Sequence, residues 1–160
     1  MLLLSLYKKT FFKKLNQKGS LVINLLVVVG IVALLTAVFI PYLRKYQPNL
    51  KLNSVSRDLT SDLRYAQQLT ITEQVVYWVY FNTIEGSYEI IRTGAATTTI
   101  REVYLPTEVS YKEINDLTGN IVSFNSYGGV SESGQIILTN TNDRISIINI
   151  KPSGYVQLIQ

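Results

Sequence analysis

The sequence KGSLVINLLVVVGIVALLTAVFIP, residues 18–41, decides how the chain is organised. Residues 21–40 are apolar except for Asn24, Gly30 and Thr36. Twenty helical residues rise about 30 Å, which is the thickness of the hydrocarbon layer of a bilayer. A buried core helix of a small domain would be shorter and would carry a polar stripe, which the centre of this segment lacks. The segment therefore predicts a transmembrane helix.

The charge of the chain is distributed unevenly around this segment. The first 19 residues contain no acidic residue and five lysines: Lys8, Lys9, Lys13, Lys14 and Lys18. The remainder holds 10 basic and 11 acidic residues, which is a net charge of −1. Lysine-rich flanks stay in the cytoplasm, so residues from about Pro41 onward are expected outside it. The basic character belongs to an N-terminal targeting segment and is not typical of a nucleic-acid footprint.

A conventional secretory signal peptide is the nearest alternative for this segment. Signal peptides have an apolar core of about 7–15 residues, followed by a cleavage site built from small residues. Here the apolar run is longer, FIPYLRKY follows it, and LLTA ending at Ala37 is a poor cleavage site. The sequence favours an anchor that is retained.

The arrangement of these residues resembles the class III leader of type IV pilins and pseudopilins. That family has a basic leader ending in glycine, a long apolar run and a proline, and Lys18-Gly19, residues 20–33 and Pro41 follow that pattern. The resemblance implies that a prepilin peptidase cuts between Gly19 and Ser20 on the cytoplasmic side and methylates the amine of Ser20. Pro41 is then the twenty-second mature residue, where pilins commonly carry proline.

Two positions depart from the family pattern. Ser20 stands where the first mature residue is usually phenylalanine, and Asn24 stands where the fifth is usually glutamate. In pilins, that glutamate is thought to pair with the methylated amine of a neighbouring subunit, and some minor pseudopilins lack it. A purely structural interpretation makes Ser20 a helix N-cap after a loop glycine. That interpretation does not explain the five lysines before Gly19 or the apolar span after it.

The helical pattern continues beyond the predicted membrane segment. Residues 42–73 form an amphipathic half, which we expect to end within 70–73. Its apolar residues recur in steps of three and four: Leu52, Val55, Leu59, Leu63, Ala66 and Leu69. Pro41 and Pro48 predict a kink or a frayed turn near each.

Residues 74–160 read as an antiparallel β domain. The stretch QVVYWVYFN is apolar on both faces, which predicts a central strand covered on both sides. Its return strand is YEIIR, and the further candidate strands are 100–105, 108–112, 121–125, 135–140, 144–150 and 154–159. With the helix stripe packed on the sheet, the expected class is α+β. The expected parts are a leader (1–19), a transmembrane half-helix (20–41), an amphipathic half-helix (42–73) and the β domain.

The region after the membrane segment resembles the GspH/FimT-type minor pseudopilins. The resemblance rests on the helix end SRDLTSDLRYAQQLTITEQ with Arg64 and Ala66, and more loosely on Phe124, Gly128-Gly129 and Gly154-Tyr155-Val156. Residues 93–120 have no clear counterpart. The resemblance implies a structural subunit of a type IV pilus, competence pilus or type II secretion pseudopilus. It further implies no cofactor or metal, and four partners: prepilin peptidase, other pilins or pseudopilins, an inner-membrane assembly platform and membrane lipid.

Three other functions are alternatives to a filament subunit. An enzyme would have to work without histidine or cysteine. Asp58 and Asp62 share a helix face, but Arg57 and Arg64 nearby favour a solvated charge network, so no catalysis is expected. A DNA-binding minor pilin for DNA uptake is not favoured, because the mature chain lacks clustered basic residues. An uncleaved single-pass anchor that displays a binding domain would have the same fold.

Overall fold

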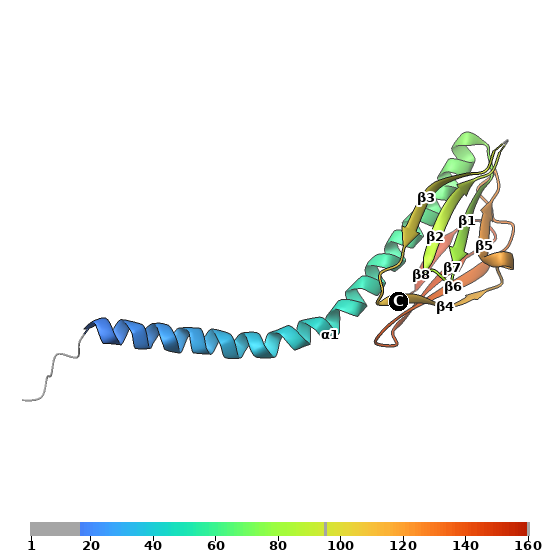
Figure 1. Ribbon diagram of the computed structural model, residues 1–160. Coiled ribbons are helices and arrows are strands. Elements are labelled where there is room, and N and C mark those ends of the chain that lie inside the picture. Colours follow the sequence, from blue (N-terminus) through green and yellow to red (C-terminus); the bar gives the residue numbers. More distant parts are fainter. Residues whose placement is uncertain (1–16, 95, 160) are drawn as a thin grey trace, which may run out of the picture. The chain divides into compact units, whose positions relative to one another are not determined.

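The computed structural model describes residues 17–94 and 96–159, with side chains described from Leu21 onward. The chain divides into two compact units, one up to Lys45 and one from Tyr46. Helix α1 (Gln17–Glu73) contributes to both, and the eight strands all belong to the second (Figure 1). Lys13 and Lys14, two of the predicted leader charges, lie outside the described residues.

Helix α1 continues through both of its prolines. Neither Pro41 nor Pro48 produces the frayed turn that was one of the two outcomes expected there. A proline inside a helix removes a single backbone hydrogen bond, and the neighbouring turns preserve the rest. Pro48 is buried in the second unit, so packing offsets part of that loss.

The second unit contains two four-stranded antiparallel sheets. The first has the order β3-β2-β1-β5, with bounds β1 Tyr77–Asn82, β2 Ser87–Arg92, β3 Thr98–Tyr104 and β5 Ile121–Phe124. The second has the order β4-β6-β7-β8, with bounds β4 Val109–Asn115, β6 Gly134–Asn140, β7 Ile145–Ile150 and β8 Val156–Ile159. A short 3-10 turn, η1 (Thr118–Asn120), precedes β5. The predicted α+β class is confirmed, and each predicted strand overlaps an observed one.

One apolar core joins the helix to both sheets. Leu59 and Leu63 of α1 are fully buried, together with Val79 of β1, Ile136 of β6 and Ile148 of β7. The predicted helix stripe is confirmed: four of its six residues are buried, and the other two pack against the core at its margin. Fully burying such a side chain contributes about 1.5–3 kcal/mol. The core therefore supplies most of the cohesion of this unit.

The prediction that β1 is covered on both faces is wrong. Tyr77, Val79 and Phe81 point into the core, but Trp78 on the opposite face is 37% exposed and Tyr80 is half-buried. Aromatic and β-branched residues are favoured in a strand by contacts with neighbouring strands, even when no further layer covers them. The apolar alternation therefore located the central strand correctly and overestimated its burial.

The helix ends where Gln74 adopts a left-handed backbone conformation (φ 57°). Its side-chain amide donates a hydrogen bond to the carbonyl of Ile71 (2.6 Å), which satisfies one of the last carbonyls of the helix. The chain then turns into β1.

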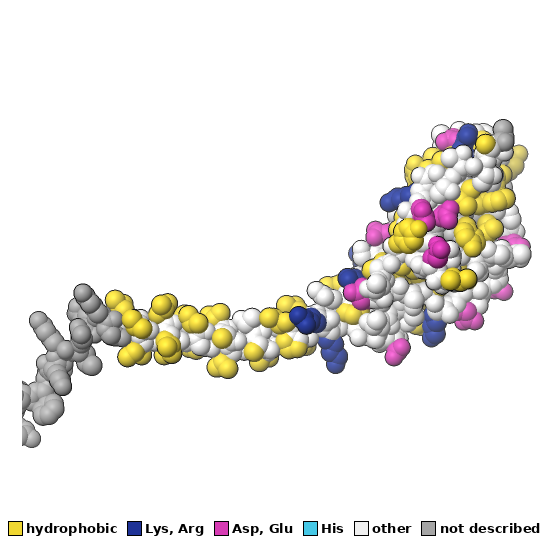
Figure 2. Space-filling model, viewed as in Figure 1, with side chains coloured by type: hydrophobic (Ala, Val, Ile, Leu, Met, Phe, Trp, Pro, Cys, Tyr) yellow, Lys and Arg dark blue, Asp and Glu magenta, His cyan; other side chains and the backbone are white. Residues whose placement is uncertain are grey.

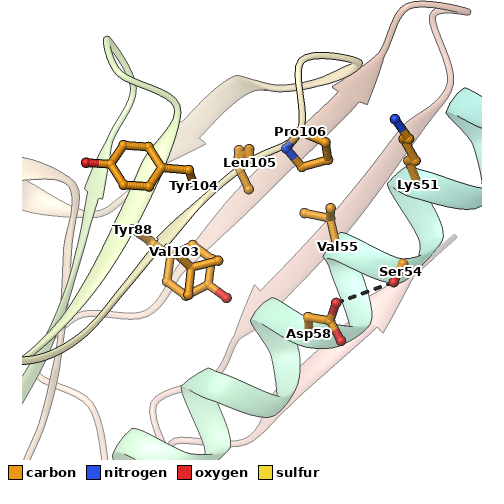
Figure 3. A pocket seen from close by; sticks show the side chains of 9 residues that line it. All are labelled: Lys51, Ser54, Val55, Asp58, Tyr88, Val103, Tyr104, Leu105 and Pro106. Atoms are coloured by element: carbon orange, nitrogen blue, oxygen red, sulfur yellow. Dashed lines mark hydrogen bonds between the residues drawn. The ribbon is translucent and has the colours of Figure 1, made fainter.

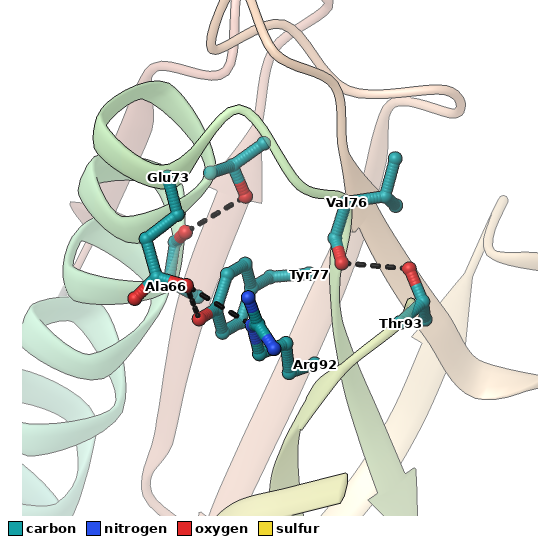
Figure 4. A network of polar contacts seen from close by, with 7 residues as sticks. Ala66, Glu73, Val76, Tyr77, Arg92 and Thr93 are labelled. Carbon is teal, nitrogen blue, oxygen red and sulfur yellow. Dashed lines mark hydrogen bonds and ion pairs between the residues drawn. The ribbon is translucent and has the colours of Figure 1, made fainter. Parts of the chain in front are cut away.

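Polar contacts fix this corner between α1 and the first sheet (Figure 4). Glu73 at the end of the helix accepts a hydrogen bond from the hydroxyl of Tyr77 (2.8 Å) and an ion-pair contact from Arg92 (3.0 Å). Thr93 closes the edge of the hairpin by donating to the carbonyl of Val76 (2.7 Å). One carboxylate thus ties the helix end to two adjacent strands.

The turn between β7 and β8 lies very close to the backbone of the β5–β6 loop. Gly154 has φ +77°, and a Cβ there would overlap the carbonyl oxygen of Gly128 and the amide of Gln67. Gln67 itself donates to the carbonyl of Gly128 (2.6 Å). Only glycine allows the β7–β8 turn, the β5–β6 loop and the helix to meet at this point.

We predict that Gly154→Ala lowers the free energy of unfolding by more than about 2 kcal/mol, because it combines a strained φ with overpacking. Gly86→Ala is the matched control, because Gly86 has a similar φ of +67° but open space around it. That variant should lose about 1 kcal/mol or less. Thermal unfolding of the full chain in detergent measures both variants. Equal losses of stability would show that the close backbone contact at Gly154 is not the cause of the destabilisation.

Candidate functional site

The residues of the predicted cleavage motif lie at the start of α1. The backbone of Lys18, Gly19 and Ser20 is helical, and their side chains are outside the described set. Asn24 and Pro41 lie further along the helix, and both are exposed. The role of these five positions in processing and assembly remains a prediction.

The first part of α1 exposes apolar side chains along the face seen in Figure 2. Between Leu21 and Ile40, fifteen large apolar side chains are each 45–72% exposed. Among the described residues, α1 alone has the length and composition needed to cross a membrane. Leaving so many apolar side chains in water is unfavourable, so this surface requires lipid or protein around it.

Polar groups inside this segment differ in how they are satisfied. Thr36 donates its hydroxyl to the carbonyl of Val32 in the same helix (2.7 Å), which removes the cost of placing it in an apolar surrounding. Asn24 presents an exposed amide. Gly30 has open space beside it, where another backbone could approach closely. These features allow helix–helix contact.

A buried carboxylate of α1 joins the helix to the first sheet. Asp62, whose side chain is 8% exposed, accepts a hydrogen bond from the hydroxyl of Tyr88 (2.7 Å) and an ion-pair contact from Arg101 (2.6 Å). Burial and the hydrogen bond to Asp62 raise the pKa of Tyr88 far above its usual value. Tyr88 therefore stays protonated and donates throughout the physiological pH range.

The expectation of a solvated network of Asp58, Asp62, Arg57 and Arg64 is wrong for Asp62. Its partners come from β2 and β3, which are 26 and 39 residues away in the sequence. Arg64 instead donates to the carbonyl of Val156 in β8 (3.0 Å). The sequence contained no local signal for these pairings, because they depend on how the strands fold onto the helix.

Asp58 and Asp62 do not form an acid–base pair. Asp58 is exposed and contacts the hydroxyl of Ser54 at 3.4 Å. Asp62 is buried and bonded to Tyr88 and Arg101. Within the described residues, no group of three or more acidic side chains is placed to hold a metal ion.

A pocket of about 290 Å³ lies between α1 and the end of β3 with the two residues that follow it (Figure 3). Its walls are mostly apolar: Val55 on the helix faces Val103, Leu105 and Pro106. At one end, Lys51 pairs with Glu108 (2.6 Å), and that contact lowers the pKa of Glu108. The remaining lining residues are Ser54, Asp58, Tyr88 and Tyr104. Of these, Tyr88 is buried, and its hydroxyl is bonded to Asp62.

We predict that Asp62→Ala lowers the free energy of unfolding by about 1–3 kcal/mol, because it leaves the buried hydroxyl of Tyr88 without an acceptor. Asp58→Ala is the matched control on the same helix and should change stability by less than about 0.5 kcal/mol. Thermal unfolding of both full-length variants in detergent tests this difference. An equal effect of the two substitutions would show that the Asp62 contacts contribute no more than an exposed charge.

Solved structures of other proteins share this architecture. No protein-family model matches the sequence, and no curated protein matches it. Among solved structures, the minor pseudopilin EpsH of the type 2 secretion system of Vibrio cholerae superposes with a TM-score of 0.59 at 9% identity, over 68% of this chain and 96% of that one. The type IV minor pilin FimU of Pseudomonas aeruginosa superposes with a TM-score of 0.57 at 12% identity, over 72% and 92%.

These similarities establish the fold. The chain has the pilin-like α+β architecture of EpsH and FimU, in which a long N-terminal helix packs on antiparallel strands. The exposed apolar start of α1 fits such a protein.

Proposed function

We propose that the chain is a minor pilin or pseudopilin, a structural subunit of a type IV filament with no catalytic role. The observation that carries the proposal is the exposed apolar helix segment 21–40 in a chain with a minor-pilin fold. A surface of this kind needs lipid before assembly and neighbouring helices after it. A subunit that leaves the membrane to enter a helical filament meets both needs.

Processing by prepilin peptidase is the first step of the proposed function. The lysine-rich leader holds the Gly19–Ser20 junction at the cytoplasmic face of the inner membrane. Cleavage after Gly19 and methylation of Ser20 release the mature N-terminus. The β domain then lies on the periplasmic or extracellular side, where it decorates the filament or its tip.

Assembly is proposed to proceed by lateral packing of α1 segments at the inner-membrane platform. Gly30, Ala33 and Ala37 are small residues that permit close approach of neighbouring helices. The amide of Asn24 can hydrogen-bond across helices, but it cannot form the ion pair with a neighbour's amine that a glutamate would form. This difference favours a subunit of low copy number, such as an initiating or tip component.

Nucleic-acid binding is the weaker candidate. Residues 46–160 contain eight basic and eleven acidic residues, a net charge of −3. Arg92 and Arg101 are engaged with carboxylates, and Arg64 with a backbone carbonyl. A phosphate-tracking groove requires clustered and available cations.

We predict that Gly19→Leu leaves the full-length precursor in the membrane, because the peptidase site requires a glycine before the scissile bond. The wild-type chain is expressed with a prepilin peptidase, and intact-mass measurement should show a start at Ser20 with one added methyl. Gly30→Leu is the matched control and should still be cut.

Normal processing of Gly19→Leu would rule out this site. A wild-type start at Met1 despite an active peptidase would instead favour the uncleaved membrane anchor.

We predict that Asn24→Glu raises the amount of this subunit in purified filaments or leaves it unchanged, because a carboxylate can pair with a neighbour's amine. Asn24→Gln keeps the amide and should leave incorporation at the wild-type level. Quantitative immunoblotting of sheared filaments measures both variants. A marked loss of assembly with Asn24→Glu would contradict the proposed role of this position.

A further inference from the structure

The outer face of the first sheet is the surface of β3-β2-β1-β5 that points away from the core. Strand alternation and register place seven large or charged side chains on it: Trp78, Tyr80, Glu89, Ile91, Glu102, Tyr104 and Ile121. None of them belongs to the core cluster, and in Figure 2 acidic and apolar side chains lie next to each other on the second unit. This face is independent of the membrane segment.

Aromatic and aliphatic residues form one part of the outer face. Trp78 is the only tryptophan of the chain and lies opposite Ile91 on one side and Ser123 on the other. Tyr80, two residues on, lies opposite Ile121. Exposed tryptophan and tyrosine side chains are enriched where proteins bind partners.

Two glutamates of the outer face are direct cross-strand neighbours. Glu89 of β2 pairs in register with Glu102 of β3, and like charges in this position are destabilising. Both glutamates accept hydrogen bonds from neutral groups: the hydroxyl of Thr99 donates to Glu89 (3.2 Å), and that of Tyr104 donates to Glu102 (2.6 Å). The hydrogen bond to Glu102, with the negative charges around it, raises the pKa of the Tyr104 hydroxyl.

The basic residues of these four strands do not compensate this charge. Every residue of the four strands is described, and the only basic ones are Arg92 and Arg101. Arg92 pairs with Glu73 and Arg101 with Asp62, both on α1 and therefore on the inner side of the sheet. The two glutamates thus lie beside a partly exposed aromatic patch without a cation from their own sheet.

A hollow at the β5 side extends the same face. It has a volume of about 260 Å³, and its lining includes Trp78, Ile121, Ser123 and Glu132. Glu132 accepts a hydrogen bond from the backbone amide of Thr118 (2.7 Å). Carboxylates therefore lie on both sides of the tryptophan, at Glu132 and across β2 and β3.

We propose that the outer face binds a lysine- or arginine-bearing segment of another protein. A cation placed between Glu89 and Glu102 relieves their repulsion, and its aliphatic stem and neighbouring apolar groups cover Trp78 and Tyr80. A cation above an aromatic ring gains further attraction from the ring. The charge of the face selects a basic partner, and its aromatic part supplies the contact area. This inference goes beyond the proposed filament role and does not depend on it.

Trp78 provides a direct reporter for the test. The full-length chain in neutral detergent is titrated with the peptide acetyl-GKVKVKG-amide, which contains no aromatic residue. Tryptophan emission should change saturably at millimolar peptide, and added salt should weaken the response because exposed charges are screened. The same peptide with glutamate in place of lysine should give no saturable change.

The variant Glu89→Gln/Glu102→Gln tests the two carboxylates. It should weaken peptide binding by at least about fivefold, as expected for the loss of two charge contacts at the surface. Its thermal midpoint should equal or exceed that of the wild type, because the like-charge pair is removed, and this shows that the loss of binding is not unfolding. The matched control Glu113→Gln/Asp143→Asn removes two charges outside the first sheet and should keep binding within about twofold.

Three outcomes would overturn the proposal. The first is unchanged binding by Glu89→Gln/Glu102→Gln, and the second is equal binding of the acidic peptide. The third is self-association of the wild-type chain that shields Trp78 and that the double variant abolishes, measured by sedimentation in the same detergent. That result would assign the outer face to a second copy of this chain.

Discussion

Burial of one stripe of α1 is the contact on which the second unit depends. Leu52, Leu59, Leu63 and Ala66 are each at most 2% exposed and belong to the core cluster that also contains residues of both sheets. A four-stranded sheet with one apolar face needs another layer against that face. The helix provides a layer shared by both sheets, so the unit has one core and not two.

Hydrogen bonds allow polar residues to lie on the buried side of this helix without a large cost. Ser56, Thr60 and Thr70 are buried, and each donates its hydroxyl to the carbonyl four residues earlier. Small hydroxyl side chains that bond to their own helix leave no unsatisfied group and allow close packing. The larger polar residues reach outward: Asp62 bonds to the first sheet and Arg64 to the second. These two contacts position the strands on the helix, while burial of the apolar stripe supplies most of the stabilising free energy.

Sequence patterns predicted the architecture well because it is governed by local periodicity. The membrane-length segment follows from composition, the helix stripe from its three-and-four spacing, and the strands from β-branched and aromatic runs between turn residues. The outer face of β1 was misjudged, because alternation reports which residues share a face and not whether a layer covers it. The partners of Asp62 were missed, because Tyr88 and Arg101 reach it only after two strands have been placed. The Gly19–Ser20 motif is predicted to be recognised by a separate enzyme, the prepilin peptidase. The fold of this chain therefore does not test it.

The contact between Arg64 and Val156 joins residues 92 positions apart, and Asn49 is bonded to Asn140 across 91 positions. Such long separations mean that the helix stripe acquires its full cover only when the last strands have been synthesised. During synthesis the chain therefore carries an uncovered apolar helix face for most of its length, a state prone to aggregation. A chain truncated before β7 would lack half of the second sheet and would keep that face open. Strands β7 and β8 are thus needed to close the core, because Ile148, Ile150 and Val156 belong to it.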